Sequence, residues 1–292
     1  MNSIRLALGA VAVCLAMPAA AVPVPPPTTF NFMSESAHTG ADAWSNAAPA
    51  NYNPINGTNY GNTRSFMGVS GLLTPVSVSA WGSTGGVGGF GGTLQTGYVG
   101  VYGSNDLGVT SRPISGNAEL NSSNNPNTGN NQHAIDNTGG YESLLFSFQS
   151  AVTLNSVSIG FPSSGSSLDS DATVLVYTGS AEPTSGFSIR TYDQLLSTGN
   201  WQIAGNLFNL AKQPGSTGAL STSFSSKYWM VGAFMNIGGN TMITHDSTAD
   251  FIKINGITVT PKLAVPEPDS LALLGIASLG LLFRRRKGAR AV

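Results

Sequence analysis

The chain has 292 residues, a formal net charge of −1 and only 9% charged residues, against about 25% in ordinary globular proteins. Glycine (36 residues), serine, threonine and asparagine take the place of the charges. This composition excludes the basic surface that nucleic-acid binding needs, and it suits a secreted β protein whose surface meets polysaccharide or matrix.

The first 21 residues have the three parts of a secretory signal peptide. Arg5 supplies a positive n-region, residues 6–17 an apolar h-region, and residues 19–21 a small-residue cleavage site. Cys14, the single cysteine, lies inside this segment. We therefore expect an exported mature protein that begins near residue 22 and has no disulfide or thiol nucleophile.

Residues 22–66 are expected to form an extended, loosely ordered N-terminal segment. Four prolines lie between residues 23 and 27, and residues 47–63 are rich in asparagine, glycine, alanine and proline without any apolar period. A second stretch of this kind, residues 113–132, is predicted to be a surface loop. The ectodomain proper is assigned to residues 67–264.

Strand patterns dominate this ectodomain. Alternating or β-branched and aromatic runs predict strands, with one short helix expected at residues 192–196. The predicted strands cover residues 76–81, 94–102, 144–148, 173–177, 201–208 and 228–237. Many short strands with glycine-rich turns predict an all-β fold, a β-sandwich that is jelly-roll-like rather than immunoglobulin-like.

Two further strands share one layout. In residues 152–159 and 252–259 the apolar residues keep one parity, an asparagine and a small residue intervene, and the parity then changes. A β-bulge restores the inward face in this way, and Gly256 is expected to take the positive φ that such bulges favour. The alternative is a two-residue hairpin with short arms. The likeness suggests a common sandwich edge, or only similar strand sequences.

Three aspartates form the candidate metal site. Asp136 lies in residues 133–141, just before a predicted strand, and Asp169 and Asp171 lie before the next one. The order Ala-Ile-Asp-Asn-Thr with a following tyrosine is similar to a segment of galactose-binding-like sandwiches, which implies calcium. Alternating carboxylates with small spacers suit a hard cation. The alternative is that Asp136 and Asn137 cap a turn and that Asp169 and Asp171 are solvated in a loop.

Signals for catalysis are weak. His133 and Asp136 would need a serine beside them, and Glu142 would need an aspartate as partner in a glycosidase pair. Neither spacing is diagnostic, so we expect no enzyme, with a glycoside or ester hydrolase as the alternative.

The C-terminal residues 265–292 have three parts in order. Val265, Pro266, Glu267 and Pro268 come first, an apolar run follows at residues 271–283, and Arg284, Arg285, Arg286 and Lys287 close it. An apolar helix stopped by cations is a stop-transfer segment. As a helix the run spans about 20 Å, against a hydrocarbon core of roughly 30 Å, which indicates a transient anchor. A buried core helix is the alternative for so short a run.

This tail resembles the PEP-CTERM sorting signal of Gram-negative bacteria. The resemblance implies recognition by an exosortase, a membrane-embedded cysteine protease, and cleavage near the Pro-Glu-Pro motif. It implies an inner-membrane intermediate and then transfer to the cell envelope, outer surface or extracellular matrix. The tail is a substrate in this scheme and carries no activity.

Together these features predict a structural or adhesive surface or matrix protein, of the kind found in biofilms. The first alternative is a calcium-assisted carbohydrate-binding module, which would be favoured if Trp81, Tyr98 and Tyr102 were exposed on one flat face. The second is a secreted hydrolase, which would place carboxylates in a deep cleft.

Overall fold

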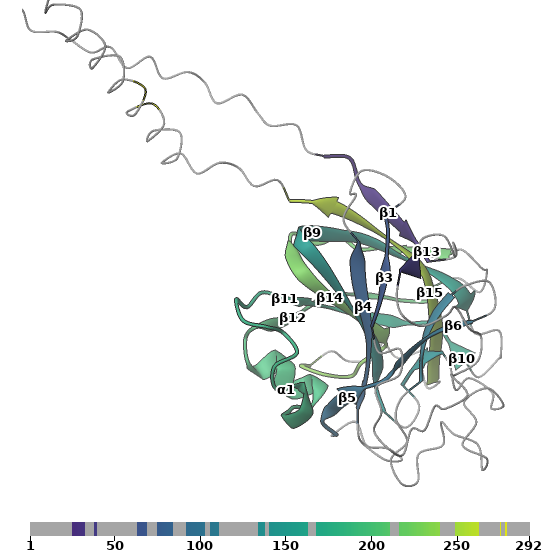
Figure 1. Ribbon diagram of the computed structural model, residues 1–292. Helices are drawn as coiled ribbons and strands as arrows, with labels where there is room; N and C mark the ends of the chain where they lie inside the picture. The colour runs from purple at the N-terminus through teal and green to yellow at the C-terminus, as the bar shows by residue number, and fades with distance from the viewer. Residues whose placement is uncertain are drawn as a thin grey trace, which may run out of the picture. The chain divides into compact units, whose positions relative to one another are not determined.

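The computed structural model describes residues 25–32, 38–39, 63–68, 75–83, 92–102, 106–110, 134–137, 140–162, 168–210, 216–239 and 249–262, together with residues 275 and 278. The chain divides into two compact units, residues 25–263 and a second unit that combines residues 1–24 and 264–292. The first unit holds the ectodomain, and Figure 1 labels most of its strands.

The described part of this unit consists mainly of strands, and the all-β prediction is confirmed. The strands join into one hydrogen-bonded sheet, in which all described pairings except that of β10 with β15 are antiparallel. The elements in chain order are β1 (Thr28–Asn31), β2 (His38–Thr39), β3 (Thr63–Phe66), β4 (Val76–Ser83), β5 (Leu94–Thr96), β6 (Tyr98–Tyr102), β7 (Asp106–Thr110), β8 (Ile135–Asp136), β9 (Glu142–Pro162), β10 (Leu168–Asp169), β11 (Ala172–Tyr177), the 3₁₀ turn η3 (Phe187–Ile189), α1 (Tyr192–Ser197), β12 (Trp201–Leu207), β13 (Ser216–Ala219), β14 (Ser226–Ala233) and β15 (Ala249–Pro261).

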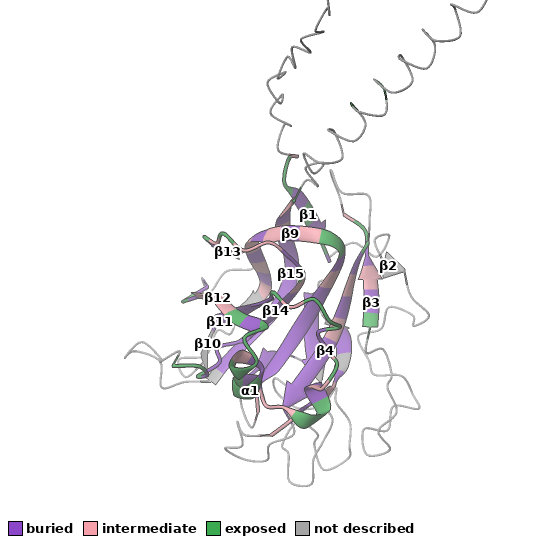
Figure 2. Ribbon diagram, turned by 90° about the vertical axis from the view of Figure 1, so that its left-hand side faces the viewer, coloured by how far each residue is buried: buried purple, intermediate pink, exposed green. Residues whose placement is uncertain are grey.

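The long strand β9 belongs to both halves of the sheet. Its first part pairs with β4 and β14, and its second part pairs with β13 and β15. We call the set β3, β4, β9, β14, β11 and β12 the first half-sheet, and the set β1, β15, β9 and β13 the second half-sheet. Gln149 and Ser150 are exposed between the two parts of β9, where the strand curves across the molecule (Figure 2).

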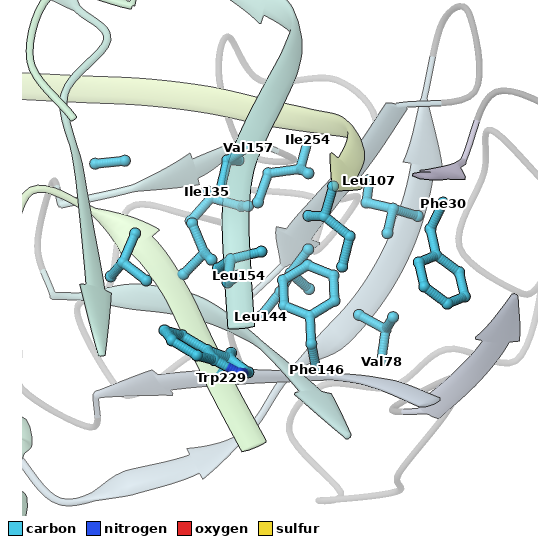
Figure 3. Packing of buried hydrophobic residues seen from close by; sticks show 14 of the residues in the cluster. Phe30, Val78, Leu107, Ile135, Leu144, Phe146, Leu154, Val157, Trp229 and Ile254 are labelled. Carbon is cyan, nitrogen blue, oxygen red and sulfur yellow. The ribbon is translucent and has the colours of Figure 1, made fainter. Parts of the chain in front are cut away.

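The two half-sheets enclose one apolar core. Leu144 and Phe146 enter it from the first part of β9, and Leu154 and Val157 enter it from the second part (Figure 3). Trp229 of β14 contributes the largest side chain, and its indole Nε1 donates to the carbonyl of Val152 at 3.1 Å. A single strand, β9, therefore supplies core residues to both half-sheets.

A second, smaller core lies on the other face of the first half-sheet. It is covered by η3 and α1, which pack Phe187, Tyr192 and Leu195 against this face. All six residues of β11 are buried as a result, so neither face of this strand is exposed to solvent. The helix begins at a capping box: Thr191 Oγ1 accepts from the N–H of Gln194, and Gln194 Oε1 accepts from the N–H of Thr191.

The bulges predicted in the two similar strands are present, and the two strands are neighbours. The register between β9 and β15 skips Asn155 in β9 and Asn255 in β15, with a third skip at Gly160. The carbonyl of Asn155 accepts from the N–H of Leu220, at 2.7 Å, and that of Asn255 accepts from the N–H of Phe32, at 2.8 Å. Each donor follows an outer strand, so β13, β9, β15 and β1 are related by a pseudo-two-fold arrangement.

Gly256 differs from the expectation in its conformation. It is not among the described residues with positive φ. A Cβ at this position would lie 2.8 Å from the carbonyl oxygen of Phe30 in the neighbouring strand. Glycine is therefore required at residue 256 by the close approach of β1, and not by the backbone angle.

The segment 22–66 contributes more to the fold than the sequence suggested. It supplies β1, β2 and β3, and Phe30, Phe32 and Phe66 are fully buried. The buried Arg64 of β3 donates from Nε to the carbonyl of Val99, at 3.0 Å, which ties β3 to β6. The predicted loop at residues 113–132 lies outside the described residues.

Candidate functional site

An acidic end lies where β8, β11 and β15 meet. We use this name for Asp136, Glu142, Asp171 and Asp250, together with Asn137, and all four carboxylates are buried. Asp136 is held in β8 by pairing with Phe251 of β15, and Asp171 directly precedes β11. Two of the three predicted calcium ligands, Asp136 and Asp171, are thus brought to the same end of the fold.

Asp250 is the centre of the hydrogen-bond network at the acidic end. Its Oδ1 accepts from the N–H of Asp171 at 2.9 Å, and its Oδ2 accepts from Nδ2 of Asn137 at 2.7 Å. The N–H of Asp250 donates in turn to Oδ1 of Asn137, at 2.9 Å. Asp171 Oδ1 accepts from the N–H of Asn209, and Glu142 Oε2 accepts from the N–H of Asp136 at 3.2 Å. The carboxylates therefore satisfy backbone donors that buried turns expose.

In the part of the chain that the structure describes, no group of three or more histidine, cysteine, aspartate or glutamate side chains is arranged to hold a metal ion. The backbone of Asp169 pairs with that of Asp250, but the side chain of Asp169 lies outside what the structure describes. Asp250, the second residue of β15, was not predicted, and Asn137 was considered only as a turn cap.

Trp81 does not form an exposed stacking surface. It is only 9% exposed, its Nε1 donates to Oγ of Ser79 at 2.9 Å, and its ring meets that of Phe187 edge to face. The side chains of Tyr98 and Tyr102 lie outside the described residues. Trp81 therefore cannot be part of the flat, exposed aromatic face that was considered from the sequence.

The candidate hydrolase residues do not form a described catalytic pair. Glu142 is buried and binds the backbone of Asp136, and His133 lies outside the described residues. Tyr192 is also buried, and desolvation raises the pKa of its phenol strongly. Its hydroxyl lies 2.8 Å from Oγ of Ser143, an arrangement that joins α1 to β9.

Asp106 of β7 and Lys253 of β15 are also buried. Burial raises the pKa of the Asp106 carboxyl, and the charge of Lys253 offsets part of this rise. Burial likewise lowers the pKa of Lys253, and Asp106 opposes that change. Oδ1 of Asp106 has no hydrogen-bond partner among the described residues.

The C-terminal residues 264–287 match the PEP-CTERM protein-sorting motif. The match includes both Val265, Pro266, Glu267 and Pro268 and the basic block Arg284, Arg285, Arg286 and Lys287, so the resemblance noted from the sequence is confirmed. The PEP-CTERM motif implies an exported protein that an exosortase processes and sorts to the cell envelope or beyond.

The structure describes two residues of this tail, Gly275 and Ser278, which are helical and exposed. No helix within the described residues combines the length and the apolar character needed to cross a membrane. The comparison with curated proteins and the comparison with solved structures found no match.

Proposed function

We propose that this protein is a structural or adhesive component of the bacterial surface or extracellular matrix, delivered there after an exosortase removes its tail. The PEP-CTERM motif at residues 264–287 is the observation that carries this proposal. In the proposed route, residues 1–21 direct export in a Gram-negative bacterium. The tail then holds the chain in the inner membrane until it is cut.

The outer face of the second half-sheet supports an adhesive role. Its side chains are small, neutral and hydroxyl-rich, and they hydrogen-bond across strands: Thr29 with Thr258, and Ser158 with Thr217 at 2.8 Å. Asn155 donates from Nδ2 to Oγ1 of Thr260 at 2.7 Å. Such a face offers hydrogen bonds without charge, which suits contact with neutral matrix polymers.

A non-enzymatic role is part of the proposal. Glu142, the acid considered for hydrolysis, is buried and accepts a backbone hydrogen bond, so a substrate would have to displace Asp136 to reach it. This arrangement favours a scaffold over a catalytic acid.

Intact-mass analysis of the protein from its native host tests the sorting proposal. We expect the mature chain to begin near residue 22, to end near the Pro-Glu-Pro motif, and to occur outside the inner membrane. A full-length C-terminus on the protein at its final location would contradict the proposal, and so would a cytosolic chain.

Calcium binding at the acidic end is the second proposal, supported by the convergence of Asp136 and Asp171 there. If the site binds calcium, saturating CaCl₂ should stabilise the fold by about 2.7 kcal/mol at one hundred times Kd. At about 2–4 °C per kcal/mol, Tm should rise by roughly 5–10 °C.

Thermal unfolding with CaCl₂ and with EDTA measures this effect. Asp171→Asn should abolish the calcium-dependent rise, whereas Glu182→Gln, at the other end of β11, should keep it. A wild-type Tm that is the same in both solutions would eliminate the ion site and leave the aspartates as acceptors for backbone N–H groups.

A further inference from the structure

A polar cleft of about 450 Å³ opens where β11 ends and β14 begins. One wall is the loop of residues 178–182 that follows Tyr177, and the other is formed by residues 225–228. Ala151, just after the exposed bend of β9, completes the lining. The cleft lies at the opposite end of β11 from the acidic end, so it is independent of the candidate calcium site.

The walls of this cleft are fixed by buried hydrogen bonds. Ser226 donates from Oγ to the carbonyl of Tyr177 and accepts from the N–H of Tyr228, at 3.0 Å. The indole of Trp229 donates to the carbonyl of Ser226, at 3.2 Å. Because β14 shifts register between Ser226 and Tyr228, Lys227 is exposed at the cleft. The site is therefore built on strands and is preorganised.

Aromatic rings support one side of the cleft. The ring of Tyr177 packs against Trp201, with centroids 5.1 Å apart, and against Tyr228, at 5.9 Å. Tyr177 and Trp201 are buried, whereas Tyr228 is half-buried and lines the cleft. Tyr177, which itself packs against Trp201, thus supports the accessible ring of Tyr228.

The remaining lining is polar and of mixed type. Glu182 supplies a carboxylate and Lys227 supplies a donor. Ser180 and Ser225 add hydroxyl groups. Oγ of Ser225 is buried and has no hydrogen-bond partner within the described part of the chain.

These features select one class of ligand. An apolar molecule would leave the hydroxyls and both charges unpaired, and an anionic polymer would meet Glu182 on a chain of net negative charge. A sugar ring has an apolar C–H face for Tyr228 and hydroxyls that both donate and accept. A volume near 450 Å³ is within the range of roughly 300–1,000 Å³ that is usual for small-molecule sites.

We propose that the cleft formed by Tyr228, Glu182 and Ser225 binds a sugar residue of a neutral polysaccharide. A second cleft, of about 280 Å³ and lined by Arg190, Asn200 and Trp201, lies along the same loop and shares Glu182 with the first. The chain of a polysaccharide would continue toward it. This inference deepens the adhesive role proposed above and rests on it only for the biological setting.

The test is binding of neutral oligosaccharides to the purified full-length chain, kept in a detergent without a sugar headgroup. Isothermal titration with cellohexaose, laminarihexaose and maltohexaose provides the probes, and hexagalacturonate is the acidic comparator. We expect binding of at least one neutral probe and weaker binding of the acidic one. Tyr228→Ala should weaken binding about tenfold, and Glu182→Gln about threefold.

Controls separate the site from the fold. Tyr228→Phe keeps the ring and should retain most of the affinity, while Ser188→Ala, an exposed hydroxyl of η3 outside both clefts, should leave binding unchanged. Glu182 is exposed, so Glu182→Gln decides the matter if Tyr228→Ala fails to fold. Failure of all neutral probes, preference for the acidic probe, or wild-type affinity in Glu182→Gln would each overturn the inference. None of these results bears on sorting, which intact mass tests separately.

Discussion

Buried carboxylates in this protein occur in two different environments. At the acidic end, Asp171 and Asp250 accept hydrogen bonds from backbone N–H groups, so their charge has compensation in the turns that they close. Oδ1 of Asp106 has no hydrogen-bond partner in the described residues. The carboxylate fits because residue 160 is glycine, since a Cβ there would overlap it. Asp106 is therefore the residue whose ionisation should weaken the fold.

The pH dependence follows from the sign of the pKa change. The pKa of Asp106 is raised on folding, so its contribution to stability is complete below its ordinary value of 3.8 and is lost as the pH rises through the folded-state pKa. Asp106→Asn removes this ionisation. Relative to wild type, the variant should therefore gain Tm as the pH rises from about 4 to 7, by about 2–4 °C for each kcal/mol of difference.

Thermal unfolding across this pH range checks the prediction, and Glu182→Gln is the matched control at an exposed carboxylate. Burial lowers the pKa of the neighbouring Lys253, and the charge of Asp106 opposes that change. A Tm difference between Asp106→Asn and wild type that stays flat, or falls, with rising pH would contradict the argument.

At the scale of the elements, the paired bulges determine how β9 and β15 lie side by side. Each bulged asparagine directs its carbonyl to the chain leaving an outer strand, Leu220 on one side and Phe32 on the other. The extra residue also returns Val157 and Ile257 to the core, since a slip of one residue would turn them outward.

Gly256→Ala tests the close approach of β1 to β15. The added methyl would lie 2.8 Å from the carbonyl oxygen of Phe30, and a paired backbone atom cannot move without loss of hydrogen bonds. Overpacking of this kind costs about 1–3 kcal/mol, so we expect Tm to fall by roughly 2–12 °C in calorimetry.

Gly205→Ala is the matched control. Its Cβ would also lie 2.8 Å from a neighbour, but that neighbour is Cδ1 of Leu220, the flexible end of a side chain. Both substitutions reduce the freedom of the unfolded chain equally, so the difference between them isolates the backbone contact. An equal change in Tm for both variants would show that β1 yields as easily as a leucine side chain.

Local patterns predicted some elements and not others for a physical reason. The runs that became β4, β11, β12 and β14 alternate or are continuously apolar, and the bulges at Asn155 and Asn255 were visible as changes of parity. The short strand β1 was not predicted, because Phe30 and Phe32 alternate over too few residues and follow three prolines. That β9 and β15 are neighbours depends on contacts about 100 residues apart, which no local pattern contains.

At the scale of the whole molecule, the sequence predicts where the protein is sorted better than it predicts what the protein binds. The sorting tail is a linear signal, so its residues could be read in order and the match at residues 264–287 confirmed them. The cleft beside Tyr228 is assembled from β9, β11 and β14, and its residues have no shared spacing in the chain. Asp136 and Asp171 lie at the same end of the fold, and Asp250, which accepts from the N–H of Asp171, became apparent only in the fold.

The basic block of the tail yields the prediction for the whole chain. The apolar run at residues 271–283 spans about 20 Å as a helix, which is shorter than the hydrocarbon core of roughly 30 Å, so cations at its end must resist translocation for the tail to stay in the membrane. Replacing Arg284, Arg285, Arg286 and Lys287 with serine should release most of the protein uncut from the membrane.

Replacing Pro266 and Pro268 with alanine should also leave the protein uncut, but held in the membrane, because the anchor is intact. Intact mass combined with membrane fractionation distinguishes the two variants: both keep the full-length mass, and only the first leaves the membrane fraction. Normal cutting of the serine variant would show that the basic block does not hold the tail for the protease.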